Sequence, residues 1–369
     1  MSDFLLPDKP NDQVYLDANA TTPVLPCIAE VVCHAMQICF GNPSSPHITG
    51  IQAKHLLEQT RQKARTVIGA QQGDILFTSG ATEGIQTAIV STLINAKHHT
   101  KPNPVLLYGA TEHKAVPNTL KHWNTVLEIN ADIIAIPVNR NGILDLDFIA
   151  QHIDNALMIC TMAVNNETGV IQPIKEVINI AKKYGCLVHC DAAQALGKIE
   201  INLNELEIDF LTLSGHKIGA PSGIGALINN NKFNLTPQIL GGGQEKGIRA
   251  GTENIFGILG FGEAALIMSE MPKKNDNQVK YLRDYLSNKI KKIRPETIFF
   301  GENSNRVSNT LLMALPNIPG DLALMKLDLA SFSVSSGSAC SSGKISKSHV
   351  VSAMGYEDLA SNSIRLSFP

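Results

Sequence analysis

The chain has 369 residues, of which 44% are hydrophobic and 17% are charged, and its formal net charge is −2. This length predicts about two domains, and the composition excludes an intrinsically disordered chain. A net charge so close to zero gives no broad positive field. Neither nucleic acid nor an anionic membrane surface is therefore expected as a partner.

The N-terminal residues 1–12 are polar and acidic, without the apolar core of a signal peptide or the arginine-rich face of a transit peptide. The most apolar window, residues 255–268, is too short to cross a bilayer and contains Glu263. The seven cysteines are an odd number and include no CxxC motif. These features predict a cytoplasmic protein with reduced, buried thiols.

The first two-thirds of the chain alternates between short apolar runs and segments with helical spacing. This alternation predicts a mostly parallel sheet covered by helices on both faces. The elements expected here are a strand at 14–17, helices over 24–40 and 51–68, a strand at 74–78, a helix from 82 to about 95, a strand at 105–108, a helix over 114–123, a strand at 132–136, a helix over 146–153, a strand at 156–161, a helix over 174–184, and strands at 186–191, 208–213 and 224–228.

The pattern changes after about residue 251. The expected elements are helices over 255–269 and 278–293, strands at 297–300 and 308–314, a helix over 321–329, a short helix over 348–354 and a strand at 363–368. We predict a large domain over 13–253 and a smaller α/β domain over 254–369, with residues 1–12 packing near the smaller one. The cysteines at 27, 33 and 39 share no helix face and lack zinc-ligand spacing, so packed thiols are expected rather than a metal site.

A lysine follows the apolar run that ends at Leu213, in the segment Leu213-Ser-Gly-His-Lys217-Ile-Gly. If the run is a buried strand, it delivers Lys217 to the carboxyl end of the sheet, where open α/β sheets bind their ligands. A lysine there can act as a nucleophile toward a carbonyl. Taken alone, the segment favours the ordinary alternative, a lysine in a surface turn.

A second motif, Ser79-Gly-Ala-Thr-Glu83, lies between a strand and a helix. Free backbone N–H groups and the positive end of the helix dipole make such a turn suitable for a phosphate. A plain strand-to-helix turn with Thr82 as the N-cap fits the motif as well.

Further polar residues follow the other strands. His113, Asn166, Asp191, Gln194, Ser214 and His216 all lie near predicted strand ends. In a parallel sheet these ends meet at one crevice. Donors for an anion, a carboxylate for a buried cation and a lysine for an aldehyde are together what pyridoxal 5′-phosphate (PLP) requires.

The chain resembles cysteine desulfurases of the NifS/IscS type, in the class V aminotransferase group of fold-type I PLP enzymes. Matching segments run in order from residue 15 to residue 365. They include Phe77-Thr-Ser-Gly-Ala-Thr-Glu83, Thr111-Glu-His-Lys-Ala-Val116, His189-Cys-Asp-Ala-Ala-Gln194, Ser214-Gly-His-Lys217, Arg249-Ala-Gly-Thr-Glu-Asn254 and Ser335-Ser-Gly-Ser-Ala-Cys340. The resemblance implies a mostly parallel seven-stranded sheet, helices on both of its faces and a smaller C-terminal domain.

The resemblance also implies a role for each site residue. Lys217 would hold PLP as a Schiff base, and His113 would stack on the ring and serve as acid or base. Asp191 would pair with the ring nitrogen and Gln194 with the ring hydroxyl. The phosphate would be held by Ala81, Thr82, Ser214 and His216, and by Thr252 of the neighbouring subunit in a homodimer. Asn166, also a cofactor contact, and Arg365 would bind the substrate carboxylate, which suits the planar fork of arginine.

Cys340 lies among serines and glycines, unlike the other cysteines. Such a setting favours an accessible, reactive thiol. The resemblance implies that Cys340 takes the sulfur of L-cysteine as a persulfide, releases L-alanine, and passes the sulfur to an acceptor such as an iron–sulfur scaffold or a carrier protein.

Two alternatives stay open at this point. One is another class V PLP enzyme, such as an aminotransferase or a C–S lyase, against which the Cys340 segment argues. The other is a sulfur-assembly interaction protein with weakened catalysis, against which the lysine, aspartate and arginine set argues. Relatives usually continue past the position of Pro369 with one more helix, so we expect a looser carboxylate-binding end.

Overall fold

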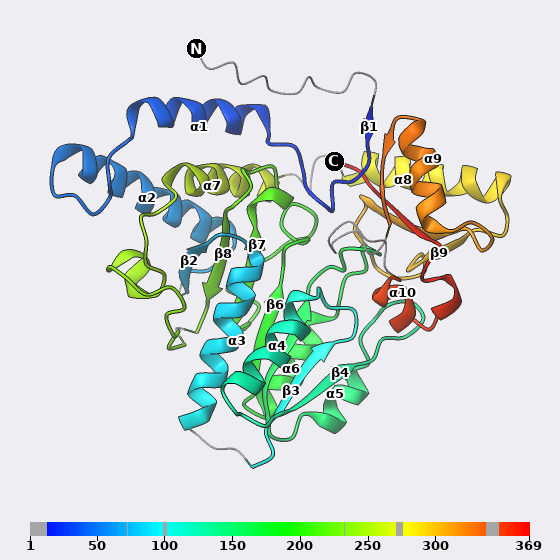
Figure 1. Ribbon diagram of the computed structural model, residues 1–369, viewed down its shortest axis with the longest axis horizontal. Helices are drawn as coiled ribbons and strands as arrows, with labels where there is room; N and C mark the ends of the chain where they lie inside the picture. Colours follow the sequence, from blue (N-terminus) through cyan, green and yellow to red (C-terminus); the bar gives the residue numbers. More distant parts are fainter. Residues whose placement is uncertain (1–12, 72, 99–101, 232, 271–275, 337–346) are drawn as a thin grey trace.

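The computed structural model describes residues 13–71, 73–98, 102–231, 233–270, 276–336 and 347–369. The N-terminal residues 1–12 and Cys340 therefore lie outside the described residues. Within the described part, a large sheet with its helices lies beside a smaller unit formed by the C-terminal third (Figure 1).

The large sheet has seven strands in the order β2-β8-β7-β6-β5-β3-β4. Its members are β2 (Asp74–Thr78), β3 (Val105–Gly109), β4 (Asp132–Ile136), β5 (Ala156–Met162), β6 (Leu187–Asp191), β7 (Phe210–Ser214) and β8 (Gly225–Asn229). β8 runs antiparallel to β2 and β7, and the other neighbouring pairs are parallel. The predicted fold class is thus confirmed.

Helices cover both faces of this sheet because its strands are apolar on both sides. β5, β7 and β8 are buried at every position, as expected for strands inside a covered parallel sheet. Along β5, Ile159 belongs to one core cluster and Cys160 to the other. One face is covered by α3 (Ala81–His98) and α4 (Ala115–Val126); the other carries α2 (Ile48–Val67), α5 (Leu146–His152), α6 (Ile174–Lys183) and α7 (Ile255–Glu270) (Figure 1).

The smaller unit is built on an antiparallel sheet in the order β12-β13-β10-β9. Its elements are α8 (Asp276–Ile293), β9 (Ile298–Phe300), β10 (Thr310–Ala314), α9 (Gly320–Leu329), β11 (Phe332–Ser333), β12 (Ser335–Ser336), α10 (His349–Ala353) and β13 (Ser363–Ser367). Helix α7 packs against α2 and α1 (Pro26–Ile38) of the large unit. The proposed domain boundary at residue 253 stays a prediction.

The first described segment joins the two units. β1 (Val14–Tyr15) pairs in parallel with β11, and Asp17 forms a bridge with Ser367 of β13. The chain then crosses to the large unit, where Thr22 N–H donates to the carbonyl of His216. Asn19, between these points, is held by both units.

The expectation of packed thiols is wrong for Cys27 and Cys33, which are exposed on α1. Only Ile28 and Ala35 of this helix are buried, because α1 touches the rest of the chain along one narrow face.

In the described part of the chain, no helix is long and apolar enough to cross a membrane.

A buried ion pair fixes the glycine-rich turn after β8 to the large sheet. Arg61 on α2 donates to both carboxylate oxygens of Glu245, with Nη2–Oε1 at 2.6 Å and Nη1–Oε2 at 2.9 Å. Glu245 also accepts the N–H of Phe77 at 3.0 Å, and Arg61 donates to the carbonyl of Ile75 at 2.7 Å. This bidentate geometry makes the ion pair strong. The pair connects α2, β2 and the glycine-rich turn.

We expect Glu245→Ala to lower the free energy of unfolding by about 3–5 kcal/mol, because it leaves the Arg61 guanidinium buried and unpaired. Urea unfolding followed by circular dichroism measures the change. Glu58→Ala is the matched control: Glu58 contacts the same arginine, but its side chain is 56% exposed. Removing such a surface partner should cost about 1 kcal/mol or less. Equal losses in the two variants would contradict the assignment of Glu245 as the essential partner.

Candidate active site

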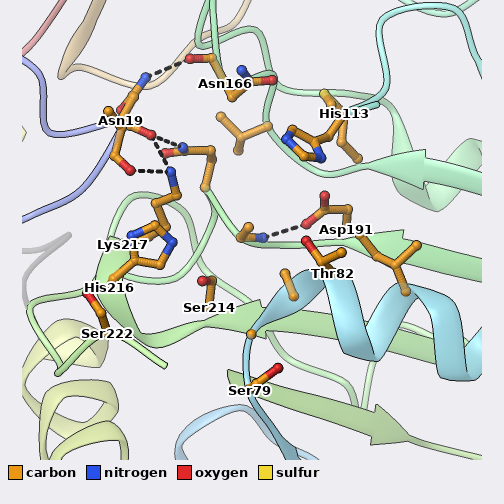
Figure 2. A pocket seen from close by; sticks show the side chains of 18 of the residues that line it. Asn19, Ser79, Thr82, His113, Asn166, Asp191, Ser214, His216, Lys217 and Ser222 are labelled. Carbon is orange, nitrogen blue, oxygen red and sulfur yellow. Dashed lines mark hydrogen bonds between the residues drawn. The ribbon is translucent and has the colours of Figure 1, made fainter. Parts of the chain in front are cut away.

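A cavity of about 450 Å³ opens at the carboxyl ends of the parallel strands, within the size range of small-molecule sites. Figure 2 shows side chains reaching it from several strand ends. It is lined by Asn19, Ala20, Ser79, Gly80, Ala81, Thr82, Ile85, His113, Met162, Val164, Asn166, Asp191, Ala193, Gln194, Ser214, His216, Lys217, Ser222 and Gly223.

Lys217 reaches this cavity from a short 3-10 turn that follows β7. The turn begins at Gly215, where a Cβ would meet the carbonyl oxygen of Ile224 at 3.0 Å and its side chain at 2.7 Å. Lys217 Nζ donates to the carbonyl oxygens of Asn19 at 2.6 Å and Ala20 at 2.7 Å. Two main-chain acceptors thus hold the amine at the cavity wall.

Asp191 ends β6 and is 7% exposed. Its Oδ1 accepts the N–H of Ala193 at 2.9 Å. Burial raises the pKa of Asp191, while the Ala193 N–H and the positive charges of His113 and Lys217 lower it. A carboxylate so poorly hydrated gains most from a cation placed in the cavity.

His113 and Glu112 follow β3 on the same side as Asp191. Figure 2 shows the His113 ring above Asp191. His113 Nδ1 accepts the N–H of Ala115 at 3.2 Å, so Nε2 carries the proton in the neutral ring. Burial, with a further contribution from the charge of Asp191, raises the pKa of Glu112 well above its ordinary value.

Hydrogen-bond donors gather at the α3 end of the cavity, around the start of that helix. The lining residues Ser79, Gly80, Ala81 and Thr82 come from this start, and Ser214 and His216 come from the end of β7. First-turn N–H groups and hydroxyls suit an anion. Burial, together with the positive charge of Lys217, lowers the pKa of His216 to about 4. A ring with this pKa is neutral at pH 7.

Arg365 lies next to the cavity without lining it. It is 1% exposed on β13, and its Nη1 donates to the carbonyl of Asn166 at 3.1 Å while Nη2 donates to Asp17 Oδ1 at 2.7 Å. Its Nε is buried without a hydrogen-bond partner among the described residues. The guanidinium is thus fixed beside Asn166, and its Nε–H is still available as a donor.

The structure brings together nine of the predicted site residues in one cavity: Ala81, Thr82, His113, Asn166, Asp191, Gln194, Ser214, His216 and Lys217. Thr252 is not among the lining residues. It is exposed and borders a separate hollow of about 380 Å³ with Met36, Phe40 and Asn254. Cys340 lies outside the described residues, so the structure does not place it.

Sequence reasoning missed Asn19 and Lys198. The carbonyl oxygen of Asn19 accepts both Lys217 Nζ and Gln194 Nε2, the latter at 2.8 Å. Its side chain is bonded to Asn166, Thr310 and Lys198. Asn19 stands between a predicted strand and a predicted helix start, and no local pattern distinguishes it.

The donor set fits a ligand with an anionic group, a cationic ring nitrogen and a carbonyl. The start of α3 and His216 would face the anionic group. Asp191 would face the ring nitrogen, and Lys217 would face the carbonyl. PLP has these three groups on a single ring. The residues present therefore fit this cofactor.

Residues 14–369 match the model of the aminotransferase class-V family. The chain is 38% identical over 364 residues to a Rickettsia felis protein named cysteine desulfurase IscS, a match that covers 97% of this chain and 87% of that one. A Dictyoglomus turgidum protein of the same name is 37% identical over 358 residues, with 96% and 89% covered.

Solved structures give the same picture. A NifS-like protein from Rickettsia africae matches with a TM-score of 0.85 and 35% identity, covering 96% of this chain and 94% of that one. SspA, solved in complex with cysteine, matches with a TM-score of 0.80 and 29% identity, covering 96% and 98%.

We expect saturating inorganic phosphate to raise the pKa of His216 from about 4 by about one unit or more, because a nearby anion favours the imidazolium. Histidine-detected NMR titration measures it. His189 is the internal control: burial lowers its pKa to about 3, and it does not line the cavity. A phosphate effect on His189 but not on His216 would contradict an anion site at this end.

The lowered pKa of His216 also makes the stability of the fold depend on pH. The unfolded chain takes up the His216 proton near pH 6.5, before the folded chain does near pH 4. The contribution of His216 to stability is therefore lost as the pH falls through this window.

Proposed function

The chain belongs to the aminotransferase class-V family, and from this premise we propose that it is a PLP-dependent cysteine desulfurase. It removes sulfur from L-cysteine, leaving L-alanine and a persulfide on Cys340. The relatives named cysteine desulfurase support this reaction, because their similarity extends over nearly the whole chain. The observation that carries the proposal is the cavity in which Lys217, Asp191 and His113 meet.

PLP, when bound, would supply an electron sink for the bonds at the substrate Cα. Lys217 is the residue that would hold it as a Schiff base. Asp191 would keep its ring nitrogen protonated through a charge-assisted hydrogen bond. Gln194 would bond the ring hydroxyl and His113 would cover the ring. The phosphate would be held by Ala81, Thr82, Ser214 and His216.

Lys217 has a second task once its amine is free. A neutral amine beside the substrate Cα can remove and return a proton. The carbonyls of Asn19 and Ala20 hold Nζ at the cavity wall, and there they would keep the amine within the cavity that the substrate enters. His113, whose Nε2 carries the proton in the neutral ring, is the second group able to give or take one.

The substrate carboxylate would be bound by Arg365 and Asn166. The unused Nε of Arg365 and its bond to the Asn166 carbonyl support this assignment. Asp17 already accepts from Nη2, so the substrate would share the guanidinium with this carboxylate. Arg365 is firmly held: it is almost fully buried and makes bonds on two sides.

Cys340 would be the sulfur acceptor within the protein. Its thiolate attacks the substrate sulfur, an S–S bond forms and the C–S bond breaks. The electron pair of the broken bond stays with the carbon skeleton, which takes up protons and leaves as alanine. The sulfur then passes to an acceptor such as an iron–sulfur scaffold or a carrier protein, and we propose the cytoplasm as the compartment.

The residues that flank the Cys340 segment support its nearness to the cavity. On one side, Ser335 pairs with Arg365 and donates to Asp17. On the other, Ser348 bonds Glu167, and His349 Nε2 bonds the carbonyl of Glu112 at 2.9 Å. Cys340 is four positions beyond Ser336 in the sequence, a reach of at most about 14 Å.

Cys340→Ser should keep bound PLP and its yellow colour but lose at least about 100-fold in alanine and sulfide release from L-cysteine, because a hydroxyl cannot take sulfur as a persulfide. Absorption spectra and product assays on the holoenzyme measure both. Cys27→Ser, at an exposed cysteine, should retain activity.

Lys217→Ala completes the experiment, because it should lose the colour as well as the activity. A coloured Lys217→Ala protein would refute the cofactor assignment. Unchanged turnover in Cys340→Ser would instead favour a C–S lyase. A coloured wild type that releases neither product would favour an interaction protein.

We also propose a homodimer in which Thr252 reaches the phosphate of the neighbouring site. Two observations support it. Thr252 does not line the cavity of its own chain and borders a hollow with Phe40 and Met36. These apolar side chains are 75% and 56% exposed, as expected of an interface that the single chain leaves open.

Sedimentation velocity should therefore give the mass of two chains, and the double substitution of Met36→Asp with Phe40→Asp should shift it toward one chain. Leu329→Asp is the matched control, since Leu329 is 85% exposed on α9. A two-chain mass that survives the double substitution would place the interface elsewhere.

A further inference from the structure

Lys198 lies in the turn after β6, four residues beyond Gln194, and its ammonium contacts two side-chain amides. Nζ donates to Gln194 Oε1 at 2.5 Å and to Asn19 Oδ1 at 3.0 Å. Lys198 itself does not line the cavity, whereas Gln194 and Asn19 do. Any effect of Lys198 on a bound ligand must therefore pass through these two residues or through its charge.

The lysine fixes which way both amides point. An amine or ammonium group offers only N–H donors here, so each amide must turn its oxygen toward Nζ. The opposite ends then face acceptors: Gln194 Nε2 donates to the carbonyl of Asn19, and Asn19 Nδ2 donates to the carbonyl of Asn166 at 3.1 Å. Turning the Gln194 amide by about 180° would place its oxygen against the carbonyl oxygen of Asn19 and its N–H₂ against the amine of Lys198. Both contacts would then be repulsive.

We propose that Lys198 is a positioning residue for the cofactor: it holds Gln194 with its N–H₂ available as a donor, and it places positive charge behind that donor. This inference rests on the proposed function. An oriented donor backed by a cation favours an oxyanion in front of it, which in PLP is the ring oxygen that Gln194 would bond.

The charges around Lys198 agree with this role. Burial lowers the pKa of Lys198 to about 7, with further contributions from the positive charges of Lys217 and Arg365. Among the described residues, none of the salt bridges involves Lys198. A bound oxyanion would supply the missing negative charge and favour the protonated lysine, and by reciprocity the lysine would favour the anion.

The test is a pH titration of the visible absorption of holoenzyme reconstituted with PLP, compared between wild type and Lys198→Met. Methionine keeps the length of the side chain and removes its charge and donors. For Lys198→Met, we expect the pH midpoint of the absorption change to rise by about one pH unit. We also expect the dissociation constant of PLP to rise about tenfold. Lys198→Arg, which keeps charge and donors, should restore most of both changes. Lys183→Met, at an exposed lysine of α6, should change neither.

Gln194→Ala supplies an independent measurement. It should raise the midpoint on its own, and adding Lys198→Met to it should raise the midpoint by less than Lys198→Met does in the wild type, because the orienting role is already lost and only the charge of Lys198 remains to be removed. A full additional shift in the double variant would overturn the inference, as would a coloured Lys198→Met protein with the wild-type midpoint. A wild-type chain that binds no PLP would refute the proposed function instead.

Discussion

The main-chain oxygen of Asn19 is the point at which the two units and the candidate catalytic lysine meet. It accepts Lys217 Nζ and Gln194 Nε2 from the large unit. The side chain of the same residue donates to Thr310 of β10 in the smaller unit. A shift of the N-terminal segment would therefore displace the lysine, the glutamine and the domain contact together, because all three depend on one short stretch of backbone.

Burial shifts four titratable groups in and beside the cavity toward the neutral form. It raises the pKa of Asp191 and Glu112 and lowers the pKa of His216 and Lys198. Such a site is poorly satisfied without a ligand. A molecule that brings an anion to one end and a cation to the other lets these groups recover their charges, so it is bound by an environment already oriented for it.

Much of the large unit follows from sequence patterns, and the site shows both the strength and the limit of such reasoning. The residues at the strand ends, such as Lys217, Asp191 and His113, were predictable because parallel strands bring their carboxyl ends to one edge. Asn19 and Lys198 were not, because their contacts are made across the fold by segments without regular patterns. Cys27 and Cys33 were expected to be packed, since an apolar helix usually is; their exposure depends on how little of α1 the single chain covers.

By itself, the sequence determined the order and kind of the elements, since apolar periodicity and turn residues act over a few neighbouring positions. It also determined which side chains stand at the ends of strands. Only the tertiary structure decided that Asn19, Gln194 and Lys198 form one hydrogen-bonded group, and that Thr252 does not line the cavity of its own chain. The physical reason is that hydrogen bonds between residues nearly 180 positions apart depend on packing of whole units, which no local pattern encodes.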